Sequence, residues 1–271
     1  MEVNVNGHTT YCYTGGKTPD PAKPTVLFIH GALNDHSVWI LQSRYFANHG
    51  WNVVCPDLPG HCRSQGTPPA TVEAAAEFIV ALIRAADQGP VALVGHSFGS
   101  LIAVEVAARE PKLVTRLALV GTAFPMKVSD ALLQGSVSNP VKAMEMVNVF
   151  SRSTLAAPPS TLGPGTWVYG GSLALAKRVF ASHPAIDLIH NNFYASFKAC
   201  NDYAGGETSI AQVSCPVLFI LGTGDQMTPP KAAQGLVGTA KNAKVVMVNS
   251  GHHHMSEAPE ETLAALRAFL K

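Results

Sequence analysis

Short apolar runs alternate with amphipathic runs along most of the chain. Uncharged runs typical of strands buried on both faces of a parallel sheet lie near residues 25–30, 51–56, 91–95, 116–121, 216–221 and 244–248. Helical periodicity or helix-forming composition is found near residues 37–49, 71–87, 98–109 and 259–270. β-forming residues at every second position on both sides of Asn6-Gly7 predict an N-terminal β-hairpin with its turn at this pair. The pattern therefore predicts an α/β fold, with a mostly parallel sheet covered by helices on both faces.

The alternation stops between Gly121 and about Gly206, where Met and aromatic residues are frequent and charges are few. Helical spacing of apolar residues predicts one helix around residues 141–150 and another around 193–197. We interpret this stretch as an inserted lid. The expected division is a core domain of residues 1–121 and 207–271 and a mainly helical lid of residues 122–206.

Ser97 is the candidate nucleophile. It stands at the centre of the pentapeptide Gly95-His96-Ser97-Phe98-Gly99, between the apolar run at 91–94 and a helical run that Pro111 ends. A strand that turns directly into a helix strains its backbone and leaves little room, which explains glycine on either side of the serine. The same pattern also arises by chance, so the interpretation depends on whether an acid and a histidine follow at suitable places in the chain.

An acid and a histidine follow later strands in the order that the Ser-acid-His arrangement requires. Asp225 lies in the turn Gly222-Thr223-Gly224-Asp225-Gln226 after one apolar run. Three histidines, His252, His253 and His254, follow the next run. His252, directly after Gly251 at the strand exit, is best placed to reach Ser97, and we expect its two neighbours to be packing or rim residues. Adjacent residues point in divergent directions, so the three do not form a metal site.

With Ser97, Asp225 and His252 in this order, the chain resembles the α/β-hydrolase superfamily over nearly its whole length. Further matches to family motifs are His30-Gly31-Ala32, which is similar to the oxyanion loop, Asp57-Leu58-Pro59-Gly60-His61, and Gly251-His252 with Glu257 and Pro259. The resemblance implies that His252 is the base and that the backbone N–H groups of Ala32 and Phe98 form the oxyanion hole. Cys62 departs from the family, which has glycine there, and we expect it to reshape the turn.

This resemblance implies a serine hydrolase that acts on a small, largely apolar carboxylic ester through an acyl-enzyme. The same triad also serves carbon–carbon bond, thioester and lactone hydrolysis and perhydrolysis, and a ligand receptor on this fold with little or no catalysis is the alternative from another class. Side chains of the lid and of the strand-end loops are expected to line the substrate pocket. The candidates are His30, Asn34, Met126, Met144, Trp167, Tyr169, Phe193 and Met227.

Composition and charge limit the classes of binding partner that we expect. Among 271 residues, 19 basic and 18 acidic side chains nearly balance, so nothing recommends nucleic acid or an anionic membrane surface, and a small-molecule substrate is expected. The sequence contains no phosphate-binding glycine motif and no metal-ligand cluster, so we expect no cofactor and no metal. Five scattered cysteines, no signal segment and no membrane-length apolar run predict a cytoplasmic protein. The oligomeric state is not predicted.

Overall fold

A single twisted sheet organises the protein, which is described by a computed structural model for residues 1–153 and 168–271. The sheet has eight strands in the order β1-β2-β4-β3-β5-β6-β7-β8. From β4 to β8 all neighbouring strands are parallel, and β2 joins β4 in antiparallel pairing. The strand bounds are Glu2–Val5 (β1), His8–Tyr13 (β2), Thr25–Ile29 (β3), Asn52–Pro56 (β4), Val91–His96 (β5), Val114–Val120 (β6), Val217–Gly222 (β7) and Ala243–Val248 (β8). The predicted α/β fold is thus confirmed.

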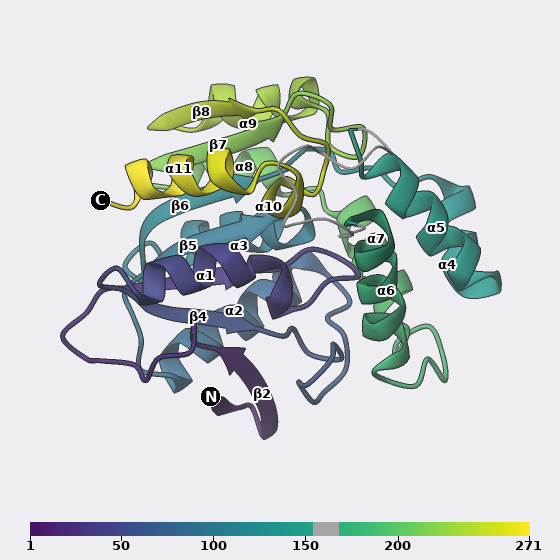
Figure 1. The fold of residues 1–271 in the computed structure, drawn as a ribbon, viewed down its shortest axis with the longest axis horizontal. Helices are drawn as coiled ribbons and strands as arrows, with labels where there is room; N and C mark the ends of the chain where they lie inside the picture. Colours follow the sequence, from purple (N-terminus) through teal and green to yellow (C-terminus); the bar gives the residue numbers. More distant parts are fainter. Residues whose placement is uncertain (154–167) are drawn as a thin grey trace.

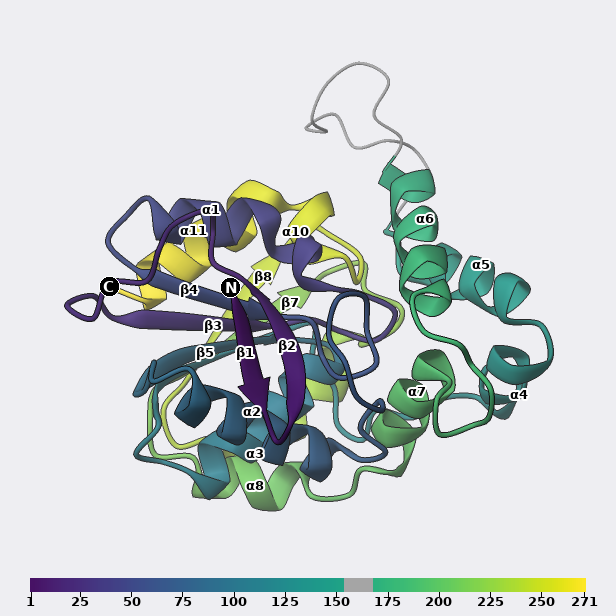
Figure 2. The same cartoon turned by 90° about the horizontal axis from the view of Figure 1, so that it is seen from below.

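Helices cover both faces of the sheet, as the view along its edge shows (Figure 2). One face carries α1 and α11, which pack on Val26 and Phe28 of β3. The opposite face carries α2, α3 and α8, which pack on Leu27 and Ile29 of the same strand. Successive side chains of a strand point to opposite faces, so an uninterrupted apolar run serves two cores at once. The helix bounds are Ile40–Ala47 (α1), Val72–Ala85 (α2), Phe98–Arg109 (α3), Gly206–Gln212 (α8), Gln234–Thr239 (α9), His254–Glu257 (α10) and Pro259–Phe269 (α11).

Between β6 and α8, the described part of the chain forms four helices that stand to one side of this layered body (Figure 1). They are α4 (Asp130–Ser138), α5 (Pro140–Phe150), α6 (Val168–Ala181) and α7 (Asn192–Asp202), and together we call them the helical segment. A third apolar cluster joins them to the body, because Leu33 from the loop after β3 packs with Met144, Phe193 and Phe197. The helical segment therefore faces the loops at the carboxyl ends of the parallel strands.

The expected helix over residues 37–49 is wrong in its first turn. A 3-10 helix spans His36–Trp39, and the α-helix begins only at Ile40. The carboxylate of Asp35 accepts hydrogen bonds from both the backbone and the hydroxyl of Ser37, which tightens this turn. The predicted helices around 141–150 and 193–197 correspond to α5 and α7. The other two helices of the segment, α4 and α6, were not predicted.

Helix α3 approaches the sheet so closely that two of its contacts admit only glycine. A Cβ atom on Gly95 of β5 would lie 2.1 Å from the carbonyl oxygen of Gly99. A Cβ atom on Gly99 would lie 2.6 Å from the carbonyl oxygens of both Ile29 and His30, at the end of β3. Both clashes are with backbone, which has no rotamer to move. These glycines therefore fix the position of the first turn of α3 relative to β3 and β5.

Replacing Gly99 with Ala is expected to lower the free energy of unfolding by about 2 to 3 kcal/mol, because overpacking against backbone forces the helix off the sheet. Gly171→Ala is the matched control: it also adds a methyl to a helical glycine, but no atom of the described residues lies within 4 Å of the added carbon. That variant should gain up to about 1 kcal/mol from helix propensity. Chemical denaturation of both variants measures the difference, and a Gly99→Ala protein as stable as wild type would contradict the close packing.

Candidate active site

Ser97 occupies the junction between β5 and α3 with a left-handed backbone. Its φ is 52° and its ψ is −119°, and it caps the N-terminus of α3. Its N–H donates to the carbonyl of Val120 on the neighbouring strand β6 at 3.0 Å. Its carbonyl accepts from the N–H and the hydroxyl of Ser100, at 2.8 and 2.6 Å. The backbone is therefore fixed on both sides, and the serine side chain lines a cavity beside the strand ends.

His252 and Asp225 form a buried pair beside the same cavity. Nδ1 of His252 lies 2.9 Å from Oδ2 of Asp225, and the two side chains are 7% and 0% exposed. The carboxylate accepts a hydrogen bond from the N–H at Nδ1, so the neutral imidazole has its unprotonated nitrogen at Nε2. Both His252 and Ser97 are among the residues that line the cavity. The three residues singled out from the sequence are thus brought together from the ends of β5, β7 and β8.

Thr228 completes this pair and was not anticipated from the sequence. Its hydroxyl donates to Oδ2 of Asp225 at 2.7 Å and lies 3.1 Å from Nδ1 of His252. The backbone N–H groups of Met227 and Thr228 donate to Oδ1 of Asp225 at 2.9 and 2.8 Å. Burial by itself would raise the pKa of Asp225, but His252 and the hydrogen bonds from Thr228 hold that pKa well below its ordinary value. Asp225 is therefore ionised at neutral pH.

The backbone carbonyl of His252 is held by two other histidines. Nε2 of His96 and Nδ1 of His254 each donate to this oxygen at 2.8 Å. Burial lowers the pKa of His254 to about 4 and that of His96 well below its ordinary value, so both rings are neutral. His254 is fully buried, which fits the expected packing role, whereas His253 is only partly buried and lines the cavity.

The loop after β3 brings a second backbone donor to Ser97. Ala32 lines the cavity next to Ser97, and Phe98 is the first residue of α3. Among the described residues, no acceptor is found for the N–H of Ala32 or of Phe98. The first N–H groups of a helix have no partner within the helix and carry partial positive charge, so Phe98 is suited to an anion. The side chain of Asn34 donates to the carbonyl of Ala32 at 3.1 Å and steadies the loop.

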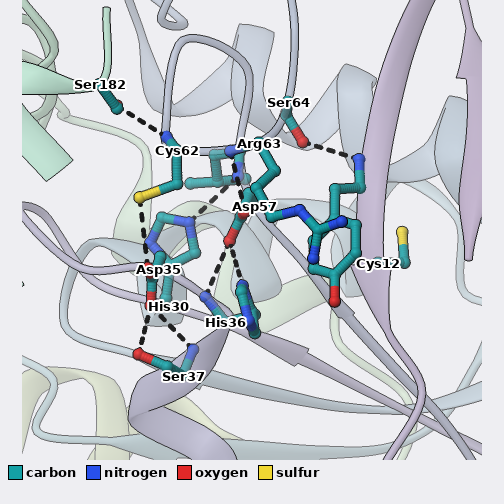
Figure 3. A network of polar contacts seen from close by, with 12 residues as sticks. Cys12, His30, Asp35, His36, Ser37, Asp57, Cys62, Arg63, Ser64 and Ser182 are labelled. Carbon is teal, nitrogen blue, oxygen red and sulfur yellow. Dashed lines mark hydrogen bonds and ion pairs between the residues drawn. The ribbon is translucent and has the colours of Figure 1, made fainter. Parts of the chain in front are cut away.

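A buried polar network anchors the loop after β3 (Figure 3). Asp57 accepts from the backbone and the ring of His36, at 2.9 and 2.7 Å, and from the backbone of Arg63 at 3.2 Å. Asp35 accepts from Ser37 and is paired with Arg178 of α6 at 2.5 Å. Asp35, His36 and Asp57 have ligand-type atoms within 4.8 Å of one another, yet every carboxylate oxygen among them already has a protein donor. Their arrangement is accounted for by loop anchoring.

Cys62 does not reshape its turn, contrary to the sequence-based expectation. It keeps a positive φ of 44°, the conformation for which glycine is suited. Its thiol donates to Oδ2 of Asp35 at 3.2 Å and its N–H donates to the hydroxyl of Ser182 at 2.9 Å, both drawn in Figure 3. Burial and the adjacent Asp35 carboxylate raise the pKa of the thiol to about 12, so it is protonated at neutral pH. These contacts offset the strained backbone and join the turn to the end of α6.

The cavity lies between the strand-end loops and the helical segment. The loops contribute Ser97, His252, His253 and Thr228, and the helical segment contributes side chains from α5, α6 and α7. Its apolar lining consists of Ala32, Leu33, Met126, Val128, Met144, Val147, Ala176, Phe197, Cys200 and Met227. Polar side chains of Asn34, His96, Lys127, Asn148, Ser151 and Ser172 complete it.

Four of the expected pocket residues line this cavity: Asn34, Met126, Met144 and Met227. Trp167 lies outside the described residues. Tyr169, near the start of α6, is not among the lining residues, and its carbonyl accepts from Asn148. Phe193 is a correction: it is fully buried behind Phe197, with ring centroids 5.0 Å apart. It supports the cavity wall without reaching the cavity.

His30 is a further correction, because it is fully buried and faces the loop backbone instead of the cavity. Its Nδ1 donates to the carbonyl of Gly31 at 2.8 Å, and its Nε2 accepts from the N–H of Leu58 at 3.1 Å. Burial lowers its pKa, which favours this neutral form. His30 therefore positions the loop that carries Ala32.

Sequence reasoning also missed Ser172, Asn148 and the roles of His96 and Thr228. A usable signal exists only for Thr228, since Asp followed three residues later by Thr in a turn is a common local hydrogen-bonding pattern. The others act through contacts between residues far apart in the chain.

In the part of the chain that the structure describes, no helix has the length and apolar character needed to cross a bilayer.

Comparison with known proteins agrees with the fold. Residues 26–266 match the model of the alpha/beta hydrolase family, and the chain belongs to this family and is a hydrolase. A relative in Acinetobacter baylyi, (E)-2-((N-methylformamido)methylene)succinate hydrolase, is 26% identical over 98% of this chain and 95% of its own length. A similar structure, an esterase from Exiguobacterium antarcticum, has a TM-score of 0.82 at 16% identity, covering 99% of this chain and 98% of its own. The enol-lactonase from Burkholderia xenovorans has a TM-score of 0.81 at 18% identity, covering 100% and 99%. At these identities the two structures establish the fold alone.

Thr228→Val is expected to lower kcat/KM about tenfold or more, because it keeps the shape of the side chain but removes the hydroxyl that donates to the Asp225 carboxylate. Thr228→Ser is the matched control and should retain most activity.

The same variant tests the pKa of Asp225. Its low pKa in the folded protein contributes stability above the unfolded value of about 3.9, and that contribution is lost as the pH falls through the folded pKa. Thr228→Val raises the folded pKa, so its deficit in unfolding free energy relative to wild type should be largest at neutral pH and shrink below about pH 4. A deficit that does not change with pH would contradict this role.

Proposed function

We propose that this hydrolase is a serine esterase that cleaves a small, largely apolar carboxylic ester through an acyl-enzyme. The observation that carries the proposal is the meeting of Ser97, on its left-handed turn, with the His252–Asp225 pair in one cavity. The proposed partner is a small molecule, and neither a metal nor a cofactor has a step in the proposed reaction.

In the first step the hydroxyl of Ser97 attacks the ester carbonyl while Nε2 of His252 takes its proton. A serine hydroxyl is a weak nucleophile at neutral pH, so this transfer is essential. Asp225 stabilises the imidazolium that forms and keeps the ring in the required tautomer. The carbonyl oxygen becomes negative and is stabilised by the N–H groups of Ala32 and Phe98, which have no acceptor among the described residues.

The protonated His252 then gives its proton to the departing alcohol, and the acyl group stays on Ser97. A water molecule attacks the acyl-enzyme, with His252 as base for the second time, and releases the acid. The free enzyme is restored with each proton returned.

The cavity lining supports an apolar substrate. Met126, Met144 and Met227 are flexible and polarisable, which suits acyl or alcohol groups of varied shape. We further propose that residues 122–206 act as a lid, because α5, α6 and α7 supply the cavity wall opposite Ser97. A lid of this kind limits access of water to the reacting carbonyl.

Ser97→Ala is expected to reduce the turnover of 4-nitrophenyl esters by about ten thousandfold or more, because the nucleophile is removed. Ser151→Ala is the control: Ser151 also lines the cavity, but its hydroxyl donates to the carbonyl of Val147 at 2.6 Å. Release of nitrophenolate across a series of acyl chain lengths measures both.

Two outcomes would overturn the proposal. Turnover that survives in Ser97→Ala would assign the chemistry to another group. Absence of turnover on every ester, together with rapid labelling of Ser97 by a fluorophosphonate, would favour carbon–carbon bond hydrolysis, and absence of labelling as well would favour a ligand receptor.

A further inference from the structure

One polar region of the cavity wall has a buried cation behind it. Ser172 of α6 and His253 of the loop after β8 both line the cavity. The guanidinium of Arg152, whose side chain is 3% exposed, contacts Ser172 from outside the lining. This region shares the cavity with Ser97 but contains none of the groups assigned to the reaction at the ester carbonyl.

Arg152 is held rigidly in place. Nη1 donates to the hydroxyl of Ser256 at 3.2 Å and lies 3.5 Å from Oε1 of Glu257. The other carboxylate oxygen of Glu257 accepts from the backbone and hydroxyl of Ser153, at 3.2 and 2.6 Å, and from the N–H of Gly251 at 2.9 Å. Glu257 thus accepts from Ser153 and Gly251 as well as facing Arg152, and the buried guanidinium lies behind the polar region of the wall.

Nη2 of Arg152 donates to the hydroxyl oxygen of Ser172. An arginine has no acceptor, so the direction of this bond is fixed, and the Ser172 proton must point elsewhere. Among the described residues no acceptor takes that proton, and the residue is half-buried at the cavity. A hydroxyl that accepts from a cation becomes a stronger donor, because hydrogen bonds in a chain polarise one another.

Ser151 offers an instructive contrast on the same wall. It too lines the cavity, yet its proton is used by the carbonyl of Val147 within α5. A serine on a helix commonly donates in this way to the preceding turn. Ser172 is therefore distinguished from its neighbour by the cation behind it and by its uncommitted proton.

We propose that Ser172, polarised by Arg152, binds an acceptor oxygen of the substrate at a position remote from the scissile ester. The oxygen belongs to a carbonyl or a carboxylate, and the rest of the substrate lies against the apolar lining. This inference rests on the proposed esterase function and deepens it, since it makes the substrate a keto-ester or a half-ester of a diacid instead of a simple fatty ester. Ser172 is a specificity-determining residue, with no part in bond breaking.

The test compares three nitrophenyl esters of nearly equal size: levulinate, which ends in a ketone, isocaproate, which ends in a branched hydrocarbon, and hemisuccinate, which ends in a carboxylate. Spontaneous hydrolysis is subtracted from each rate. Wild type should prefer the oxygen-bearing esters, and Ser172→Val should lose about tenfold or more of that preference with little change on isocaproate, because a hydrogen bond from a polarised donor is lost. The levulinate and hemisuccinate rates tell a neutral acceptor from an anionic one.

Two controls separate binding from folding. Ser172→Thr keeps the hydroxyl on a side chain of the same shape as Val, so it should keep the preference. Ser151→Ala should leave it unchanged. A second series, phenyl acetates with a para acetyl or para isopropyl group, asks the same question of the alcohol side. If the preference in both series is the same in Ser172→Val and Ser172→Thr, the proposal is wrong.

A binding measurement that needs no turnover distinguishes failure of the esterase proposal from failure of the Ser172 proposal. Calorimetric titration of methyl levulinate and methyl isocaproate into Ser97→Ala and into Ser97→Ala with Ser172→Val gives the preference at equilibrium. A levulinate preference confined to the protein that retains Ser172 supports the inference even where no ester is hydrolysed. Equal preference in both proteins overturns it, whatever the activity on esters.

Discussion

The left-handed backbone at Ser97 depends on how closely α3 approaches the sheet, and most of the site depends on that backbone in turn. A non-glycine residue with positive φ is held only where its surroundings fix it. Here β6 binds the N–H of Ser97, Ser100 binds its carbonyl, and Gly95 and Gly99 let the first turn of α3 rest on β3 and β5. The same approach places the N–H of Phe98 beside the loop that carries Ala32. The positions of the proposed nucleophile and of the proposed oxyanion donors thus depend on one packing contact.

A second set of constraints fixes His252, the proposed base. Asp225 and Thr228 hold the ring of His252, and His96 and His254 hold its backbone carbonyl. His96 directly precedes Ser97, so its ring links the nucleophile turn to the histidine loop by a hydrogen bond across 156 positions of sequence. Because burial keeps both supporting rings neutral, they hold the carbonyl without adding positive charge next to the base. The relative position of Ser97 and His252 is therefore built into the loops that carry them.

The sequence could predict those features that depend on local pattern. Uninterrupted apolar runs indicated the strands, and the glycines around Ser97 indicated the sharp turn. It could not predict the role of His30, which was expected in the pocket because it directly follows a strand. Its ring instead bonds to the loop backbone, and its partner there is the N–H of Leu58, 28 residues away in the chain. Phe193 has the same helical spacing as Phe197, and only the packing of α7 against its neighbours determines which ring reaches the cavity. Cys62 shows the reverse case, in which tertiary partners keep a conformation that local preference disfavours.

The polar network behind the loop after β3 and the polar region of the cavity wall have a common feature, since each ties the helical segment to the body through a buried charge. Arg178 of α6 pairs with Asp35, and Arg152, just after α5, contacts Glu257 in α10. A buried ion pair contributes little net stability, because desolvation offsets most of the attraction, but breaking it is costly. The pair of Arg152 with Glu257 is buried on both sides, so it favours one placement of the helices more than it stabilises the fold. The pair of Arg178 with Asp35 is buried only at Asp35, because the Arg178 side chain is 61% exposed. Under the proposed role of Ser172, Arg152 serves twice, because its charge positions the helical segment against Glu257 and polarises the hydroxyl that would select the substrate.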